Sequence, residues 1–161
     1  MRFGSDRDIS LMVNIGRELL HDIIEQEIMY YKLSIEDLEM NLYGESLEKS
    51  FFEGVKLNCL ITRGDQVIDI QEFGPDLGRE ASFAFIRQDL VDKTVVPQVG
   101  DIVKWHNDYY EVDTVRENQL FLGRDNNYNL ESSTSGFGRS MSIVVDCHLT
   151  KADRVGLEDI R

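Results

Sequence analysis

The spacing of apolar residues changes once along the chain, and its first part predicts a helix. From about Asp6 to Tyr31, apolar residues recur at steps of three and four, which is the period of one helix face. Ser5 or Asp6 can cap the start, because a short polar side chain accepts hydrogen bonds from the unpaired N–H groups of the first turn. The expected apolar face consists of Ile9, Met12, Val13, Leu19, Leu20, Ile23 and Ile24.

The opposite side of this helix is mostly polar and should meet water or a polar partner. It consists of Asn14, Glu18, His21 and Glu25. Leu11 and Ile15 interrupt it, and Gly16 lies on the apolar side, where a neighbour could approach closely. Two interpretations follow. The helix covers the protein's own core, or its first half, with Leu11 and Ile15, docks on another subunit.

A polar stretch then separates the helix from a region with a period of two. Ser34 to Asp37 resembles a helix start and predicts one or two turns, and residues 41–49 predict a loop. Val55, Leu57, Cys59 and Ile61 share one face of an expected strand. Residues 63–65 (Arg-Gly-Asp) predict a turn, with residues 66–70 as the returning strand of a hairpin.

The second half of the chain repeats the pattern of short strands and turns. A strand over 81–87 should place Phe83 and Phe85 on one side, and Pro97 and Gly100 should break the chain. A strand over 102–106, a hairpin turn at Asn107-Asp108, strands over 109–115 and 119–122, and a last strand over 140–149 follow. This order predicts the α+β class: a small antiparallel β-barrel or sandwich with a long N-terminal α-helix.

A chain of 161 residues fits one domain, since domains take roughly 100–200 residues. We expect a helical N-terminal part over 1–40, a β-barrel core over 51–149 and a C-terminal tail over 150–161. Residues 124–139 have no apolar period, and a loop of this length is usually functional or ordered only by a partner. Its aromatic residues Tyr128 and Phe137 are candidate contacts between subunits.

Charge narrows the possible functions. The net charge of −13, from 17 basic and 30 acidic residues, argues against a basic nucleic-acid surface and a polybasic membrane anchor. No apolar run approaches the ~20 residues of a membrane span, and the first residues are too polar for a signal peptide. Two cysteines, Cys59 and Cys147, form no disulfide framework, so a reducing compartment is the simplest expectation.

Candidate catalytic chemistry is sparse. Asp146, Cys147 and His148 are consecutive, but strand alternation turns Cys147 toward the apolar side and the other two residues away from it. A buried core cysteine is the favoured interpretation, and a solvated charge pair is favoured over an acid–base pair of Asp146 and His148. Calcium-loop and dinucleotide-loop patterns near residues 125–141 lack required positions. We therefore expect no catalytic, metal or cofactor residues, and a protein that is not an enzyme.

Four segments carry a resemblance to a known family. They are residues 41–45 (NLYGE), 51–61 with Phe51-Phe52 and Val55–Ile61, 73–92 with Phe73–Asp76 and Phe83–Asp92, and 97–112 with Pro97–Val103 and Tyr109–Val112. In order and spacing they resemble neck proteins of tailed bacteriophages, including the head-closure or stopper group. The resemblance covers about residues 41–149, and the long N-terminal helix departs from the simplest stopper pattern.

The resemblance implies a structural virion protein that forms a ring with copies of itself between the head and the tail. The partners implied are the portal or an adaptor protein, and a tail terminator or other neck proteins. Genomic DNA would pass through the lumen without specific binding, no membrane would be involved, and assembly would occur in the host cytoplasm. A tail terminator or another connector ring is the nearest alternative, and a soluble small-barrel interaction module or an unrecognised hydrolase is a more distant one.

Overall fold

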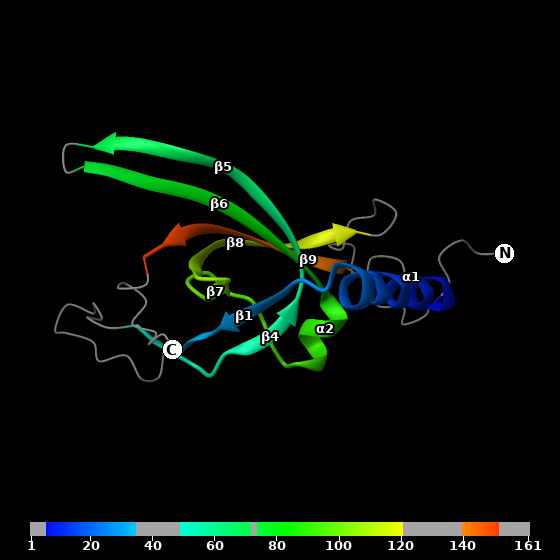
Figure 1. Cartoon of the computed structure of the whole chain (residues 1–161). Helices are drawn as coiled ribbons and strands as arrows, with labels where there is room; N and C mark the ends of the chain where they lie inside the picture. The colour runs from blue at the N-terminus through cyan, green and yellow to red at the C-terminus, as the bar shows by residue number, and fades with distance from the viewer. Residues whose placement is uncertain (1–5, 35–48, 72–73, 121–139, 152–161) are drawn as a thin grey trace.

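The protein is described by a computed structural model over residues 6–34, 49–71, 74–120 and 140–151. Its N-terminal half contains α1 (Asp6–Glu18), the π-helical η1 (Leu19–Ile24), β1 (Glu27–Tyr31), β2 (Leu33–Ser34), β3 (Ser50–Phe51), β4 (Val55–Asn58) and β5 (Leu60–Gln71). Its C-terminal half contains β6 (Gly74–Ile86), α2 (Arg87–Asp92), β7 (Ile102–Trp105), β8 (Asp108–Leu120) and β9 (Ser140–Thr150). The α+β class is confirmed (Figure 1).

One antiparallel sheet of seven strands, in the order β4-β1-β7-β8-β9-β6-β5, forms the body of the protein. The two edge strands, β4 and β5, follow one another in the chain with only Cys59 between them. The sheet therefore curls toward itself, but β4 and β5 do not pair with each other in the described part of the chain, and the sheet does not close. The expected barrel is not shown. The small strands β2 and β3 pair separately.

The core lies on the inner face of the curled sheet and is built from alternate strand positions. Leu57 and Cys59 are buried, as the period of two predicts, and Val55 and Ile61 pack against them. The largest fully buried side chains of this core are Tyr30, Tyr110, Phe83, Phe85, Leu57, Leu90, Val103, Val112 and Val145. Ile102 is buried in a separate cluster with Tyr109. The prediction that Phe83 and Phe85 share the inward side is confirmed.

The expected helix, from about Asp6 to Tyr31, is wrong in its last part. Helical structure ends at Ile24, and Glu25 takes a left-handed conformation with a φ of 50°. The Glu25 N–H donates to the Leu20 carbonyl at 3.1 Å, which closes the last turn. Residues 27–31 instead form β1, because pairing with β4 on one side and β7 on the other buries Ile28 and Tyr30 at alternate positions.

The first expected hairpin turn is also wrong. Residues 63–65 lie inside β5, where the pairing register with β6 shifts between Arg63 and Gln66. A Cβ atom on Gly64 would lie 3.1 Å from the Glu80 carbonyl oxygen, so glycine serves a close strand contact at an irregularity. The returning strand is therefore β6, whose Gly74 pairs with Gln71, and residues 66–70 continue β5 outward (Figure 1).

Two details differ in the second half. The turn between β7 and β8 is His106-Asn107, one residue earlier than predicted, with a positive φ of 55° at His106. The two strands expected over 109–115 and 119–122 are one strand, β8, because register shifts let it follow β9 without a break. The strands expected over 102–106 and 140–149 match β7 and β9 to within one residue.

Several predictions fall on parts of the chain outside the described residues. These are the helical turn after Ser34, the loop up to residue 48, the 124–139 loop with Tyr128 and Phe137, and the tail beyond residue 151.

Candidate interaction surface

The N-terminal helix contacts the sheet along one side only. Leu20 is buried there, and Val13 and Ile24 are half-buried. Gly16 lies against β6, where a Cβ atom would be 3.2 Å from Cδ1 of Ile86. The prediction that Gly16 meets a close neighbour is confirmed.

A second apolar side of the same helix faces away from the sheet, and we call it the outer stripe. Its side chains are between 40% exposed at Met12 and 74% exposed at Ile23. Steps of three and four residues place its members on one side. The outer stripe consists of Leu11, Met12, Ile15, Leu19 and Ile23. Contiguous exposed apolar surface of this kind is typical of interaction sites.

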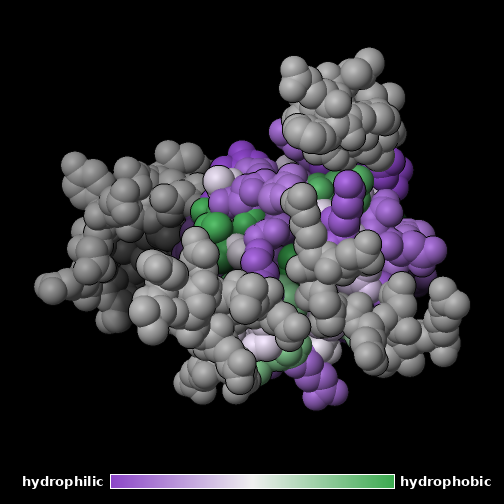
Figure 2. Space-filling model, turned by 90° about the vertical axis from the view of Figure 1, so that its left-hand side faces the viewer, coloured by the Kyte–Doolittle hydropathy of each residue, from purple (hydrophilic) through white to green (hydrophobic). Residues whose placement is uncertain are grey.

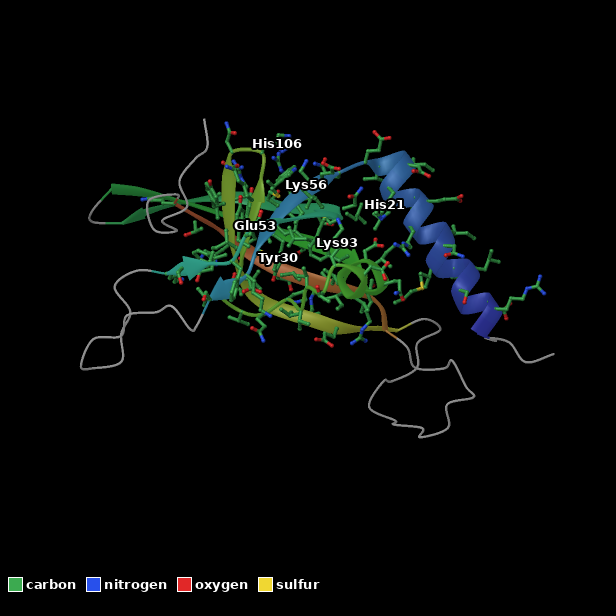
Figure 3. All side chains as sticks on the ribbon, turned by 90° about the horizontal axis from the view of Figure 1, so that it is seen from below. His21, Tyr30, Glu53, Lys56, Lys93 and His106 are labelled. Carbon is green, nitrogen blue, oxygen red and sulfur yellow. The ribbon has the colours of Figure 1, made fainter. Side chains whose placement is uncertain are left out.

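This arrangement corrects the predicted apolar face. Met12, Leu19 and Ile23 were expected to face the core with Leu20, but they belong to the outer stripe. The apolar residues divide between two sides of the helix because the sheet is in reach of only one. Figure 3 shows α1 along the flank of the body, with side chains extending away from it. Docking of Leu11 and Ile15 on another subunit stays a prediction.

An ion-pair cluster between α1–η1 and α2 fixes the orientation of the helix. The Asp89 carboxyl group is buried, and its Oδ1 lies 2.8 Å from Nε of Arg17. Its Oδ2 lies 3.0 Å from Nε2 of His21. The exposed Asp92 also binds Arg17, at 3.0 Å. The polar partner expected for His21 is therefore Asp89.

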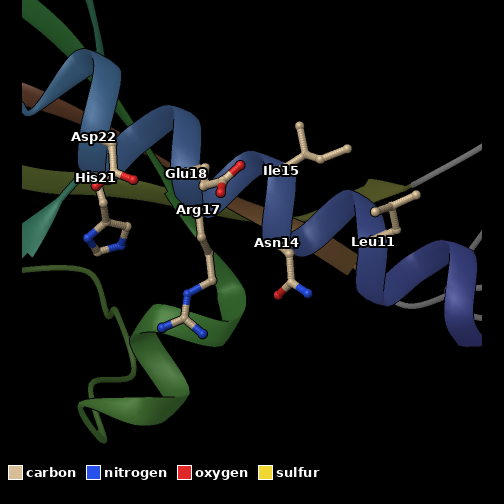
Figure 4. A pocket seen from close by; sticks show the side chains of 7 residues that line it. All are labelled: Leu11, Asn14, Ile15, Arg17, Glu18, His21 and Asp22. Atoms are coloured by element: carbon tan, nitrogen blue, oxygen red, sulfur yellow. The ribbon is translucent and has the colours of Figure 1, made fainter.

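The cluster and the outer stripe lie on different sides of the helix. A hollow of about 620 Å³ adjoins them, lined in the described part of the chain by Leu11, Asn14, Ile15, Arg17, Glu18, His21 and Asp22. Figure 4 shows Arg17 and His21 directed toward α2, and Leu11 and Ile15 directed away from it. The amide of Gln88 and the guanidinium of Arg17 lower the pKa of Asp92, so this carboxylate remains charged.

A second exposed apolar surface, the loop patch, lies at the other end of β1. It consists of Phe52, Val96 and Val99, which are 50%, 57% and 66% exposed. The Phe52 N–H donates to the Lys32 carbonyl at 2.9 Å, and the Lys32 amino group donates to the Val96 carbonyl at 3.4 Å. Segments from three parts of the chain therefore meet around Lys32.

The buried carboxylate of Asp101 holds the base of the loop patch. Its Oδ2 accepts hydrogen bonds from the Tyr30 hydroxyl at 2.6 Å and the Gln98 N–H at 2.8 Å. Its Oδ1 accepts one from the Leu33 N–H at 2.9 Å. Burial, and then the hydrogen bond and charge of Asp101, raise the pKa of Tyr30. Gly100, with a φ of 90°, allows the tight approach.

Sequence reasoning missed the role of Asp101, although Gly100-Asp101 belongs to one of the segments that carry the family resemblance. Its three donors come from β1, from the start of β2 and from the segment before β7. The sequence does contain a signal for this role, because Asp101 is an acidic residue directly before an apolar strand. A carboxylate buried at such a position needs hydrogen-bond donors.

The structure turns Cys147 away from Asp146 and His148, as predicted, but the charge pair expected between Asp146 and His148 is not formed. Cys147 is buried in line with Ile143 and Val145. Asp146 instead binds Ser82, Thr114 and Arg116, at 2.7, 3.1 and 2.6 Å. His148 pairs with Asp113 at 2.8 Å, so the structure does not bring Asp146 and His148 together. Partial burial alone would raise the pKa of Asp146, but these hydrogen bonds outweigh it and lower the pKa.

Both cysteines should resist thiol reagents in the folded protein. Burial raises the pKa of Cys59 to about 12, and burial with the nearby charges of Asp113 and Asp146 raises that of Cys147. Because the thiolate is the reactive form, we expect no labelling at neutral pH until the chain is unfolded in urea, when both thiols should react. Rapid labelling of Cys147 in the folded chain would contradict this expectation.

Leu60 and Val91 are further exposed apolar residues outside these two surfaces. Figure 2 views the side that lies at the left of Figure 1, where hydrophobic residues form small areas among hydrophilic ones. Within the described ranges, no three His, Cys, Asp or Glu side chains are grouped so that they could hold a metal ion. None of the helices in that part of the chain is long and apolar enough to cross a membrane.

Comparison with known proteins finds similarity to solved structures. No protein-family model matches the chain, and no curated protein matches it. A chain from the "Virion of native gene transfer agent (GTA) particle" matches with a TM-score of 0.47 and 8% sequence identity. The match covers 78% of this chain and 94% of that chain. A similarity at this level establishes no shared function.

Proposed function

We propose that this protein is a structural subunit of a tailed-phage virion and forms a ring in the neck, between the portal and the tail. The outer stripe of α1 and η1 is the observation that carries the assembly role, because five large apolar side chains exposed along one helix favour a partner surface. The resemblance of residues 41–149 to phage neck proteins supports the neck as the assembly to which the protein belongs. In this proposal the protein has no enzymatic activity.

The rigid attachment of both apolar surfaces supports a structural role. Asp89 ties the helix to α2, and Asp101 ties the loop patch to β1 and β2. Each surface is therefore presented in one orientation before a partner binds, and a surface ordered in advance loses less conformational entropy on binding.

Strong negative charge supports a channel that conducts DNA without holding it. Tight binding to duplex DNA requires Lys or Arg at several phosphates, where they release counterions. With a net charge of −13, the purified protein should show no binding to a fluorescent DNA duplex at physiological salt, measured by anisotropy. A known DNA-binding domain serves as the positive control. Tight binding that weakens steeply with added salt would contradict the proposed channel.

Deletion of the gene from the phage genome that carries it tests the proposed function. Electron microscopy should show DNA-filled heads and complete tails that fail to join, and a plasmid copy of the gene should restore whole particles. Complete infectious particles without the gene would reject a neck role. Binding of the purified protein to isolated tail tubes but not to portals would instead favour the tail terminator alternative.

A further inference from the structure

The edge strand β5 is long, and its far half belongs to the sheet only through β6. Residues 66–71 pair with residues 74–79, whereas β9 pairs only with residues 80–86 of β6. In the described part of the chain, residues 66–71 and 74–79 thus form a ribbon of two strands. Figure 1 shows the ribbon projecting beyond the other strands. A sheet of two strands is marginally stable in water and gains independent stability from a third strand, so the ribbon is a place where a further strand would stabilise the protein.

The other free strand edges carry features that oppose pairing with a further strand. β4, at the opposite edge of the sheet, has four residues, and its Lys56 carbonyl accepts a hydrogen bond from the Lys93 amino group. Pro75 lies in the part of β6 that belongs to the ribbon. Short strands and edge prolines are two ways in which proteins block an exposed edge. β5 has twelve residues without proline or lysine, and its one register shift comes before Gln66, so residues 66–71 present a regular edge without such a feature.

The position of Pro75 indicates which backbone groups lie on the free edge of β5. In an antiparallel ladder, hydrogen-bonded residue pairs alternate with pairs whose N–H and C=O groups face away from each other. Pro75 pairs with Ile70 and fits the second kind, because it has no N–H to donate to Ile70. Alternation then places the N–H and C=O groups of Gln66, Ile68 and Ile70 on the outer edge of β5. The backbone of another extended strand offers acceptors and donors at the same repeat.

A second copy of the chain supplies the strand that the ribbon lacks. Antiparallel pairing of the two β5 strands gives a sheet in the order β6-β5-β5-β6, which exceeds the three strands that an independently stable sheet needs. With Ile68 of both copies opposite one another, Gln66 of each copy pairs with Ile70 of the other. These pairs make about six hydrogen bonds, two for each pair. Pro75 interrupts the outer edge of β6, so the edge of β5 that is open in one copy meets the same edge in the other.

We propose that two copies of this chain associate through the free edges of β5, antiparallel and about a two-fold axis. The contact is isologous, because each copy contributes the same surface. It goes beyond the proposed neck function, since a two-fold contact joins two copies and does not by itself build a ring. The neck role and this contact therefore stand or fall in separate experiments.

Proline substitutions on the two edges of the ribbon test the proposal. In the full chain, Ile68→Pro removes an outward N–H from β5, and the two-fold axis repeats the loss in the second copy. Self-association should weaken about 30-fold or more, as measured by sedimentation velocity against protein concentration. Leu77→Pro is the matched control, because Leu77 pairs with Ile68 and its outward N–H lies on the edge of β6. The control variant should associate like the wild type.

Cysteine substitutions at the same two positions give a signal that does not depend on a loss of association. Ile68→Cys places two thiols opposite each other across the axis, at a Cα separation of about 5.5 Å that a disulfide can span. Both native cysteines are buried. Mild oxidation should therefore convert most of the Ile68→Cys protein to a disulfide-linked pair and leave Leu77→Cys as single chains, as seen on a non-reducing gel.

The response to salt separates this contact from one held by ion pairs. Each copy has a net charge of −13, so the two copies repel, while the hydrogen bonds between them join uncharged groups. Raising the salt concentration from about 50 mM to about 500 mM should strengthen association, because salt screens the repulsion. Association that weakens with salt, an Ile68→Pro variant that associates normally, or equal cross-linking of the two cysteine variants would each overturn the proposal. Wild-type protein that stays monomeric up to about 1 mM would also overturn it and would assign the edge to a strand of another protein.

Discussion

Replacement of Asp101 by Ala should lower the free energy of unfolding by about 3–5 kcal/mol, a large part of the stability of an ordinary domain. The carboxylate is 1% exposed and accepts hydrogen bonds from Tyr30, Leu33 and Gln98. Its removal leaves three buried donors without an acceptor. Urea unfolding followed by the fluorescence of Trp105, the chain's single tryptophan, measures the loss.

Two further variants make the Asp101 prediction specific. Asp113→Ala removes an exposed aspartate that pairs with His148, and should change stability by less than about 1 kcal/mol. Tyr30→Phe removes one donor and leaves the carboxylate in place, so it should cost about 1 kcal/mol. Equal stability of the Asp101→Ala and Asp113→Ala variants would show that the carboxylate does not hold the base of the loop patch.

Replacement of Asp89 by Ala should release α1 and η1 from the body while the sheet remains folded. Asp89 provides the buried ends of the contacts to Arg17 and His21. Among the residues of the two helices whose burial the structure describes, Leu20 is the one buried apolar residue. Loss of about 2 kcal/mol from the ion pair with Arg17 and the hydrogen bond with His21 should speed amide hydrogen exchange in residues 6–24 about 30-fold. Exchange in β8 and β9 should be unchanged.

Asp92→Ala provides the matched control for this prediction. Asp92 lies on the same short helix and binds the same Arg17, but its side chain is 45% exposed. Exposed ion pairs contribute little, so exchange in residues 6–24 should change less than about five-fold. Similar exchange in the Asp89→Ala and Asp92→Ala variants would place the attachment of the helix in its apolar contacts instead.

The release of the helix also bears on assembly. An outer stripe on a loosely attached helix must be ordered again when it binds, and the entropy cost of ordering weakens association. In the phage, the Asp89→Ala variant should therefore give fewer complete particles than the Asp92→Ala variant, although neither substitution lies in the outer stripe or the loop patch.

The inward face of most strands could be predicted from the sequence alone. Strand residues alternate between two faces through local geometry, so the pattern around Leu57 and Cys59, around Phe83 and Phe85, and around Cys147 was sufficient. The same locality explains why β7 and β9 were predicted to within one residue: apolar runs ended by turn residues mark them clearly.

Turns and helix ends were predicted less well, because the same short sequence is compatible with more than one local structure. Residues 63–65 have a sequence typical of a turn, but they lie inside a long strand, where the close approach of the Glu80 carbonyl to Gly64 requires glycine. Residues 27–31 continue the apolar period of the helix, and it is their pairing with β4 and β7 that makes them a strand.

The sequence by itself determined the α+β class, the inward residues of the strands, the buried state of Cys147 and the acidic character of the surface, because each depends on near neighbours or on composition. Only the tertiary structure decided where α1 and η1 end, which of their apolar residues stay exposed, and what Asp89 and Asp101 do. Asp89 meets His21 across 68 positions of the chain, and Asp101 meets Tyr30 across 71. Contacts over such separations exist only after the chain has folded, and no local period records them.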